Sequence, residues 1–429
     1  MSRAVGHKPN TCTFCGKSEM HVNRLIAGPR GTFICDECVK TCYAIVDGER
    51  RHANEPRNVT NSTRVLPPRT IFKHLDDYVV GQEAAKRALS VAVYNHYKRI
   101  ENKQRLIDVE IGKSNVLLVG PTGSGKTLMA QTLAKVLDVP FTIADATALT
   151  EAGYVGEDVE SILTRLIQAA DNDIARAERG IVYIDEIDKI ARKSGANPSI
   201  SRDVSGEGVQ QALLKIIEGN RVWVPPSVGR KHPQGEVVQI DTTDILFICG
   251  GTFEGVQEHI AERIGSKRRI GLLPAQAPSS KKNERSQLLH QISEDDLMRQ
   301  GMIPELIGRL PVMVALDALD QRSLVEVLTR PRNAIIKQYQ QMLKLDNVEL
   351  SFTDDGLRAA ADEAIKHGTG ARGLRTIIER TLADSMYEVP SRRDVRKIVV
   401  DAAAVRGQAD PAMYDVHGKL IGQQLNLAA

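Results

Sequence analysis

A glycine-rich motif at residues 120–127, Gly-Pro-Thr-Gly-Ser-Gly-Lys-Thr, restricts this chain to a small number of folds. The motif follows an apolar run and opens a segment in which apolar residues recur at helical spacing. In such a strand–loop–helix unit, backbone N–H groups wrap phosphates, Lys126 faces the outer phosphates and the Thr127 hydroxyl can ligate magnesium. A glycine-rich turn without a ligand is the weaker alternative. The predicted nucleotide-binding residues are Gly120, Pro121, Thr122, Gly123, Ser124, Gly125, Lys126, Thr127 and Leu128.

Short apolar runs alternate with helical patterns between residues 71 and 314, which predicts an α/β fold with a parallel sheet covered by helices. The run at 181–184 ends in Asp185 and Glu186, and ligands bind at the carboxyl ends of parallel strands. We expect Asp185 to hold magnesium and Glu186 to polarise the attacking water, both being catalytic together with Lys126. Without the glycine-rich motif, a strand ending in Asp-Glu would more often be a solvated cap. The expected strands are 115–119, 141–144, 181–184, 245–248 and 312–314.

The composition argues against several classes of partner. The chain has 429 residues, enough for about three domains, and its 57 basic and 54 acidic residues leave a formal net charge of +3. No global field therefore attracts nucleic acid or an anionic membrane, and aromatic residues make up only 4%, too few for rows of base-stacking rings. No apolar run approaches the ~20 residues of a membrane-spanning helix, and the N-terminus lacks the apolar core of a signal peptide. We expect a cytoplasmic protein without nucleic-acid or membrane partners.

Changes in composition along the chain predict its domain organisation. The first 50 residues are rich in cysteine, and residues 51–68 have the polar, proline-containing composition of a flexible linker. A large domain is expected at 69–316, with a mobile basic loop at about 265–284. A smaller, mainly helical domain is expected at 317–409, with a helix that Thr353 caps, followed by a loose tail at 410–429.

The cysteines near the N-terminus have the spacing of a metal site. Two Cys-x2-Cys pairs, Cys12 with Cys15 and Cys35 with Cys38, fit a tetrahedral four-thiolate zinc site. A unit of about 50 residues with few large apolar side chains would be marginal without metal, so zinc is predicted to be structural. Cys42 is more simply a small buried apolar residue than a ligand.

The glycine-rich motif and the Asp-Glu strand resemble the AAA+ ATPases. Segments 153–156, 230–232, 308–311 and 370–373 narrow the resemblance to the Clp/HSP100 family and extend it over nearly the whole chain. The resemblance implies a large AAA+ domain, a small α/β C-terminal domain and a treble-clef-like zinc domain. It also implies a homohexameric ring that uses ATP and magnesium to unfold protein substrates, thread them through its pore and deliver them to the ClpP peptidase, or act as a chaperone, with adaptors and no protease site of its own.

The resemblance assigns roles at the nucleotide site. Arg309 resembles the arginine finger that reaches the nucleotide of a neighbouring subunit, although the sequence alone would favour a surface salt bridge. Arg372 resembles the second sensor, an arginine of the same subunit that touches nucleotide. Val80 and Gly81 resemble the segment lining the adenine pocket, although an apolar pair is by default core. Thr252 is a candidate for the first sensor.

Two segments resemble the pore loops of this family. Tyr154 and Val155 lie between glycines and would grip a polypeptide by shape and apolar contact, whereas sequence alone suggests a turn. A basic pore loop is implied by Arg230, Lys231 and His232, whose alternative is a solvated hairpin tip.

A third segment resembles the peptidase-docking tripeptide. Ile270, Gly271 and Leu272 stand where the family usually has Ile/Leu-Gly-Phe, which docks into apolar clefts on ClpP. Leu replaces the aromatic residue but remains a large apolar anchor, so docking is still expected.

Two other functions compete with protein unfolding. A nucleic-acid motor of the helicase or clamp-loader type would use the zinc unit and the basic loop, but the near-neutral charge and scarce aromatics argue against it. A nucleotide-gated adaptor scaffold would not need a water-activating carboxylate at Glu186.

Overall fold

The computed structural model describes residues 10–43, 65–103, 109, 111–150, 157–191, 206–225, 237–268 and 287–421. It divides into two compact units, Met1–Arg64 and Val65–Ala429. No helix within these described ranges is long and apolar enough to cross a membrane.

The N-terminal unit is a small β-hairpin followed by a helix. Strands β1 (Leu25–Ala27) and β2 (Phe33–Cys35) pair antiparallel, and residues 36–43 are helical. Among the side chains described in this unit, only Cys12 and Cys35 are buried. An apolar core therefore does not hold this unit together, as the expectation of a zinc-dependent fold requires.

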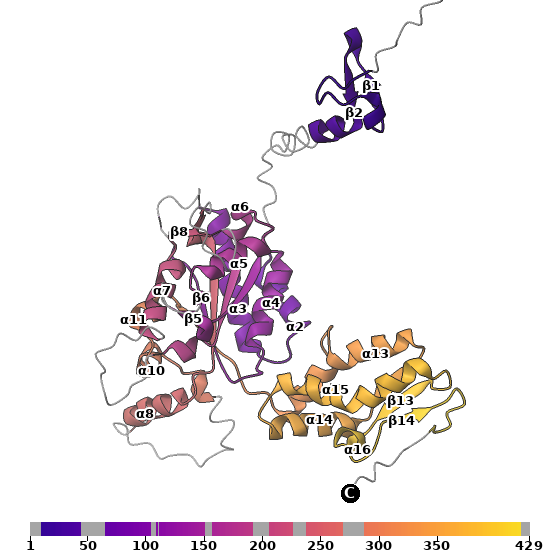
Figure 1. The fold of residues 1–429 in the computed structure, drawn as a ribbon. Coiled ribbons are helices and arrows are strands. Elements are labelled where there is room, and N and C mark those ends of the chain that lie inside the picture. The colour runs from indigo at the N-terminus through magenta and orange to yellow at the C-terminus, as the bar shows by residue number, and fades with distance from the viewer. Residues whose placement is uncertain are drawn as a thin grey trace, which may run out of the picture. The chain divides into compact units, whose positions relative to one another are not determined.

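The second unit is built on a five-stranded parallel sheet, as predicted (Figure 1). All five expected strands lie in it, and their order is β11-β3-β10-β7-β4. Because the strands are parallel, their carboxyl ends meet at one edge of the sheet, where ligands bind in folds of this class. The strands are β3 (Val116–Val119), β4 (Phe141–Asp145), β7 (Ile181–Asp185), β10 (Leu246–Gly251) and β11 (Val312–Ala315).

Helices cover both faces of this sheet (Figure 1). Successive strand residues point to opposite sides of the sheet, so each face carries apolar side chains that a layer of helices buries. On β3, Val116 and Leu118 belong to one apolar core, whereas Leu117 and Val119 belong to the other. The first core includes side chains of α2 (Pro68–Asp76), α3 (Glu83–Glu101) and α4 (Lys126–Leu137). The second includes side chains of α5 (Ser161–Ala169), α7 (Glu207–Ile217), α8 (Val256–Arg268), α10 (Glu294–Arg299) and α11 (Pro304–Gly308).

Smaller elements connect these layers. Strands β8 (Arg221–Val224) and β9 (Val238–Asp241) form an antiparallel pair, and β5 (Leu149–Thr150) pairs with β6 (Glu157–Asp158). A short helix, α6 (Ile174–Ala177), precedes β7.

The C-terminal part of the second unit has a third apolar core of its own. Its sheet has the order β12-β13-β14, and the Thr353 hydroxyl caps α14 by accepting a 3.3 Å hydrogen bond from the Gly356 N–H, as predicted. The prediction of a loose tail from residue 410 is wrong for β14, because this strand pairs with β13. The elements are α12 (Gln321–Thr329), α13 (Ile335–Leu345), β12 (Glu349–Phe352), α14 (Asp354–Lys366), α15 (Ala371–Glu388), β13 (Lys397–Val400), α16 (Ala402–Val405) and β14 (Ala412–Tyr414).

Candidate nucleotide and metal sites

The glycine-rich loop turns from β3 into α4 at the carboxyl edge of the large sheet. Gly123 and Gly125 have positive φ angles of 77° and 100°, which side chains other than glycine rarely adopt. The loop thereby aims the N-terminus of α4 into a cavity, and a helix N-terminus favours anions such as phosphate.

Lys126 is the first residue of α4 and is almost completely buried. Its ammonium group donates hydrogen bonds to the carbonyls of Gly120, at 2.6 Å, and Pro121, at 3.0 Å. Burial lowers the pKa of Lys126, while the nearby Asp185 carboxylate raises it. The Lys126 ammonium group is therefore bonded to carbonyls of its own loop, and it would have to leave them to bind a phosphate.

Two residues from different elements bring oxygen atoms together beside the loop. The Thr127 hydroxyl donates a 3.0 Å hydrogen bond to one carboxylate oxygen of Asp185. The other oxygen accepts bonds from the Tyr183 hydroxyl, at 3.1 Å, and the Glu186 N–H, at 3.0 Å. The Asp185 side chain is thus held in place by three donors.

Glu186 follows β7 in a strained backbone conformation. Its φ of 56° and ψ of 34° are left-handed, which costs a non-glycine residue about 1–2 kcal/mol. The side chain is exposed and lines the cavity. Strain of this kind persists only where the surroundings impose it, and it is common at active sites.

The cavity at the end of α4 has a volume of about 410 Å³. It contains most of the residues predicted from the glycine-rich motif and the Asp-Glu strand. Its lining is Thr122, Gly123, Gly125, Lys126, Thr127, Leu128, Gln131, Asp185, Glu186, Asp188, Lys189, Gly251, Thr252, Glu254, Ala371 and Arg372.

Several lining residues were not predicted from the sequence, and Asp188 is the best connected of them. Its carboxylate accepts two 3.0 Å hydrogen bonds from Thr252, one from the backbone N–H and one from the hydroxyl. Thr252, the candidate first sensor, therefore lies in the cavity and is bonded to the segment after β7. The sequence signal for Asp188 was its position three residues after Asp185, in the short helical turn that follows β7.

Arg372 reaches the cavity from the first turn of α15. The glycine-rich loop touches the residues just before this helix, because a Cβ on Gly123 would lie 2.9 Å from the Thr369 carbonyl oxygen. The Cβ would also lie 3.1 Å from Gly370 Cα. Gly123 thus permits a close approach between the loop and α15.

Some predicted nucleotide-binding residues do not line the cavity. Val80 is buried, and Gly81 has a positive φ of 64°; neither is part of the lining, nor are Gly120 and Pro121. Ser124 is also outside the lining, and its buried hydroxyl oxygen has no hydrogen-bond partner.

Arg309 is not part of this cavity. It follows α11, is about half exposed, and its guanidinium group forms a 3.0 Å ion pair with Glu218. Within one chain this is the surface salt bridge that the sequence offered as the alternative.

The four predicted zinc ligands converge in the N-terminal unit. The Sγ atoms of Cys12, Cys15, Cys35 and Cys38 all lie within 4.8 Å of one another. Tetrahedral zinc with Zn–S bonds of about 2.3 Å needs sulfurs about 3.8 Å apart, so the four thiols fit the ion.

Backbone hydrogen bonds favour the thiolate form of Cys12. Burial raises its pKa, but hydrogen bonds from backbone N–H groups, first that of Cys15, outweigh burial and lower the pKa to about 6. A thiolate is the form that ligates zinc. Cys42 is not a member of the cluster.

Several predicted segments lie outside the described residues. They are the two pore loops, with Tyr154, Val155, Arg230, Lys231 and His232, the docking tripeptide Ile270, Gly271 and Leu272, residues 51–64 of the expected linker and residues 269–284 of the expected basic loop. The expectation of a loop is wrong for residues 265–268, because they belong to α8.

Comparison with known proteins agrees with both sites. Residues 10–48 match the ClpX C4-type zinc finger, residues 112–313 match the AAA domain (Cdc48 subfamily), and residues 319–401 match the C-terminal, D2-small domain of ClpB protein. The ATP-dependent Clp protease ATP-binding subunit ClpX of Treponema denticola is 54% identical over 390 residues, which cover 91% of this chain and 92% of the relative. The chain therefore belongs to the ClpX family, and it is an AAA+ ATPase with a structural zinc site.

Proposed function

We propose that this chain is an ATP-driven protein unfoldase and translocase that works as a hexameric ring and delivers polypeptides to the ClpP peptidase. The observation that carries the proposal is the convergence of Lys126, Asp185, Glu186 and Arg372 on one cavity, in a chain 54% identical to ClpX. A site with both a phosphate-binding lysine and an exposed carboxylate is suited to hydrolysis and not only to nucleotide binding.

The oxygens beside the loop fit magnesium. Neighbouring ligands of octahedral magnesium lie about 2.9 Å apart when its bonds are about 2.0–2.1 Å long. The Thr127 and Asp185 oxygens are separated by 3.0 Å. When bound, the ion would neutralise charge on the phosphate oxygens.

Each residue then has a defined task in hydrolysis. Lys126 leaves the carbonyls of Gly120 and Pro121 and pairs with the phosphates. Glu186 orients and polarises the attacking water from the strand end. Arg372 of the same chain contacts the nucleotide. Because Arg372 lies on α15, this contact couples nucleotide binding to the orientation of the C-terminal part.

Arg309 would act in a neighbouring subunit. Its exposed guanidinium lies outside the cavity of its own chain, so it would have to exchange Glu218 for a phosphate across a subunit interface. An arginine supplied in this way accelerates phosphoryl transfer by about 10³–10⁵ in other systems. It would also make hydrolysis depend on assembly of the ring.

The pore loops would convert hydrolysis into movement of a polypeptide. Tyr154 and Val155 would grip the polypeptide by apolar contact, and Arg230, Lys231 and His232 would help to select substrates. The tripeptide Ile270, Gly271 and Leu272 would dock on ClpP. The zinc unit would receive substrates and adaptors.

The ATPase rate with different polymers tests the proposal. We expect a chemically unfolded protein to stimulate the rate, and single- or double-stranded DNA to leave it unchanged. Tyr154→Ala should abolish unfolding of a fluorescent protein with an unstructured extension. Stimulation by DNA alone would replace the proposal with a nucleic-acid motor.

A further inference from the structure

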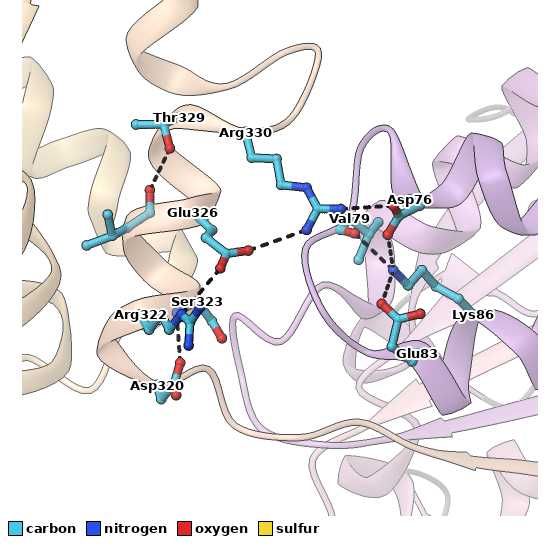
Figure 2. Close-up of polar contacts among 11 residues, drawn as sticks. Asp76, Val79, Glu83, Lys86, Asp320, Arg322, Ser323, Glu326, Thr329 and Arg330 are labelled. Carbon is cyan, nitrogen blue, oxygen red and sulfur yellow. Dashed lines mark hydrogen bonds and ion pairs between the residues drawn. The ribbon is translucent and has the colours of Figure 1, made fainter.

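A network of ion pairs between side chains of alternating charge extends from α3 to α12 (Figure 2). The Asp76 carboxylate binds two cations, one with each oxygen: Lys86 of α3 with Oδ1 and Arg330, which follows α12, with Oδ2 at 3.0 Å. Glu83 pairs with Lys86 at 3.0 Å, and Glu326 pairs with Arg330 at 3.4 Å. Asp76 is thus the shared member that connects two parts of the unit.

The buried ammonium group of Lys86 holds the Asp76 carboxylate in place as its counter-ion. The Lys86 side chain is completely buried, and its ammonium group lies 5.1 Å from the centre of the Phe72 ring. A buried ammonium group needs a hydrogen-bonded counter-ion, because desolvation of an unpaired charge is costly. Asp76 is only partly exposed and meets this need.

The same lysine contacts the backbone next to the nucleotide cavity. Lys86 Nζ lies 3.5 Å from the Val79 carbonyl oxygen, within reach of a weak hydrogen bond. The Val79 side chain in turn approaches the glycine-rich loop, since a Cβ on Gly125 would lie 3.8 Å from Val79 Cγ1. Arg330 is therefore connected to the phosphate-binding loop through Asp76, Lys86 and Val79.

Two more contacts hold the same segment. The Arg332 N–H donates a 2.9 Å hydrogen bond to the Asp77 carbonyl, and the Arg332 guanidinium pairs with the Asp77 carboxylate at 3.4 Å. Gln82 and Asp317 exchange two hydrogen bonds of 2.8 and 2.9 Å. Residues 317 and 330–332 thus bind the chain on both sides of Val79–Gly81.

The Gly123–Gly370 contact alone would leave the C-terminal part free to rotate about one point. The Asp76–Arg330 ion pair restricts that rotation, together with the Arg332–Asp77 and Gln82–Asp317 contacts. The direction in which α15 presents Arg372 to the cavity therefore depends on these contacts as well as on the loop contact.

We propose that Asp76 and Arg330 are positioning residues that set the orientation of α15, and hence of Arg372, toward bound ATP. The proposal rests on the proposed ATP site, and it does not depend on protein unfolding. It assigns a role to a buried lysine and an ion pair that the hydrolysis mechanism itself does not use.

Steady-state ATPase kinetics of the full-length chain, without protein substrate, test this role. Arg330→Met should raise the KM for ATP by about threefold to fivefold, the size expected from losing one exposed ion pair. The kcat should stay within about twofold, because the residues at the reacting phosphate are untouched. Arg330→Lys keeps the charge and should restore most of the affinity.

Arg322→Met is the matched control. Arg322 lies on α12, the helix that precedes Arg330, and is 89% exposed. It approaches Glu326 at 3.8 Å without contacting Asp76. Its KM should equal that of the wild type. Thermal unfolding of each variant would show that the fold is retained.

A double-mutant cycle separates positioning from general destabilisation. In an Arg372→Ala background, Arg330→Met should raise KM no further, because both changes remove the same contact with ATP. The proposal is overturned if Arg330→Met and Arg322→Met have equal KM values, if Arg330→Lys behaves like Arg330→Met, or if the two KM increases multiply. If Arg372→Ala alone leaves KM unchanged, the role of Arg372 fails, and this proposal fails with it, whereas the unfolding assay remains a separate test.

Discussion

The Thr127 hydroxyl and the Asp185 carboxylate are joined by a 3.0 Å hydrogen bond, although 58 residues separate them in the sequence. The two residues come from the start of α4 and the end of β7, which the parallel sheet brings to the same edge. This contact places two oxygen atoms side by side next to Lys126. The two residues proposed to hold magnesium are therefore already neighbours in the folded chain.

Glu186→Gln should bind ATP but hydrolyse it about 10²–10⁴ times more slowly, because the amide cannot accept a proton from water. A fluorescent ATP analogue measures binding, and phosphate release measures the rate. Glu258→Gln, an exposed position on α8, is the control and should retain the wild-type rate. A normal rate for Glu186→Gln would remove the base assignment.

Cys35→Ala should lose zinc, whereas Cys42→Ala should keep about one ion per chain. The reason is that Cys35 belongs to the four-thiol cluster and Cys42 does not. Elemental analysis of the purified variants measures the metal. The ATPase rate in the absence of protein should be similar in both variants, because the zinc unit is compact by itself. Equal zinc contents would show that the ligand set is wrong.

His96 should make stability depend on pH. Its ring is buried, and burial, followed by the nearby charges of Arg99 and Lys113, lowers its pKa to about 3. An unfolded histidine has a pKa near 6.5, so the unfolded chain binds more protons as pH falls below about 6.5. His96 therefore removes stability on acidification, by at most about 1.4 kcal/mol per pH unit.

His96→Gln should weaken this dependence while keeping a donor for the Asp244 carbonyl, which lies 3.0 Å from Nε2. The difference between the unfolding midpoints of variant and wild type, measured from pH 5 to 7.5, isolates this group from the other residues that titrate in that range. His417→Gln, at an exposed position, is the control. A difference that does not change with pH would contradict the prediction.

Gln210→Leu should destabilise the large domain. The buried Gln210 amide donates to the carbonyls of Ile190, at 2.9 Å, and Gly301, at 3.2 Å, and accepts from the Ile303 N–H at 2.9 Å. Leucine leaves these backbone groups without those partners, which costs at least about 2 kcal/mol.

The neighbouring Gln211 provides a control for that change. It is exposed on the same helix, so Gln211→Leu should alter stability by less than about 0.5 kcal/mol. Chemical denaturation measures both variants. Similar midpoints for the two variants would mean that the buried amide contributes little.

Leu272→Phe should strengthen binding to ClpP, and Leu272→Ala should weaken it by about tenfold, because a large apolar side chain is proposed as the anchor. Leu273→Ala, at the adjacent position, should have little effect. Binding of the ATP-loaded chain to immobilised ClpP measures all three. Equal affinities would place the docking contact elsewhere.

The sequence by itself predicted the features that depend on local spacing. Short runs of three to five residues predicted all five strands of the large sheet, and the glycine-rich motif predicted the loop that opens α4. Two Cys-x2-Cys pairs predicted a thiol cluster that the structure brings within 4.8 Å. These predictions succeed because a strand end or a tight turn places its side chains through its own backbone geometry.

Only the tertiary structure decided which distant side chains meet. Asp188 and Thr252 follow the adjacent strands β7 and β10, and Asp76 and Arg330 are 254 residues apart in the sequence. Their pairing depends on strand order and on how the C-terminal part packs against α2. A local sequence pattern predicts neither of these. Tertiary packing likewise decided that Arg309 forms an ion pair with Glu218 in this chain. It also decided that β14 pairs with β13 and does not belong to a loose tail.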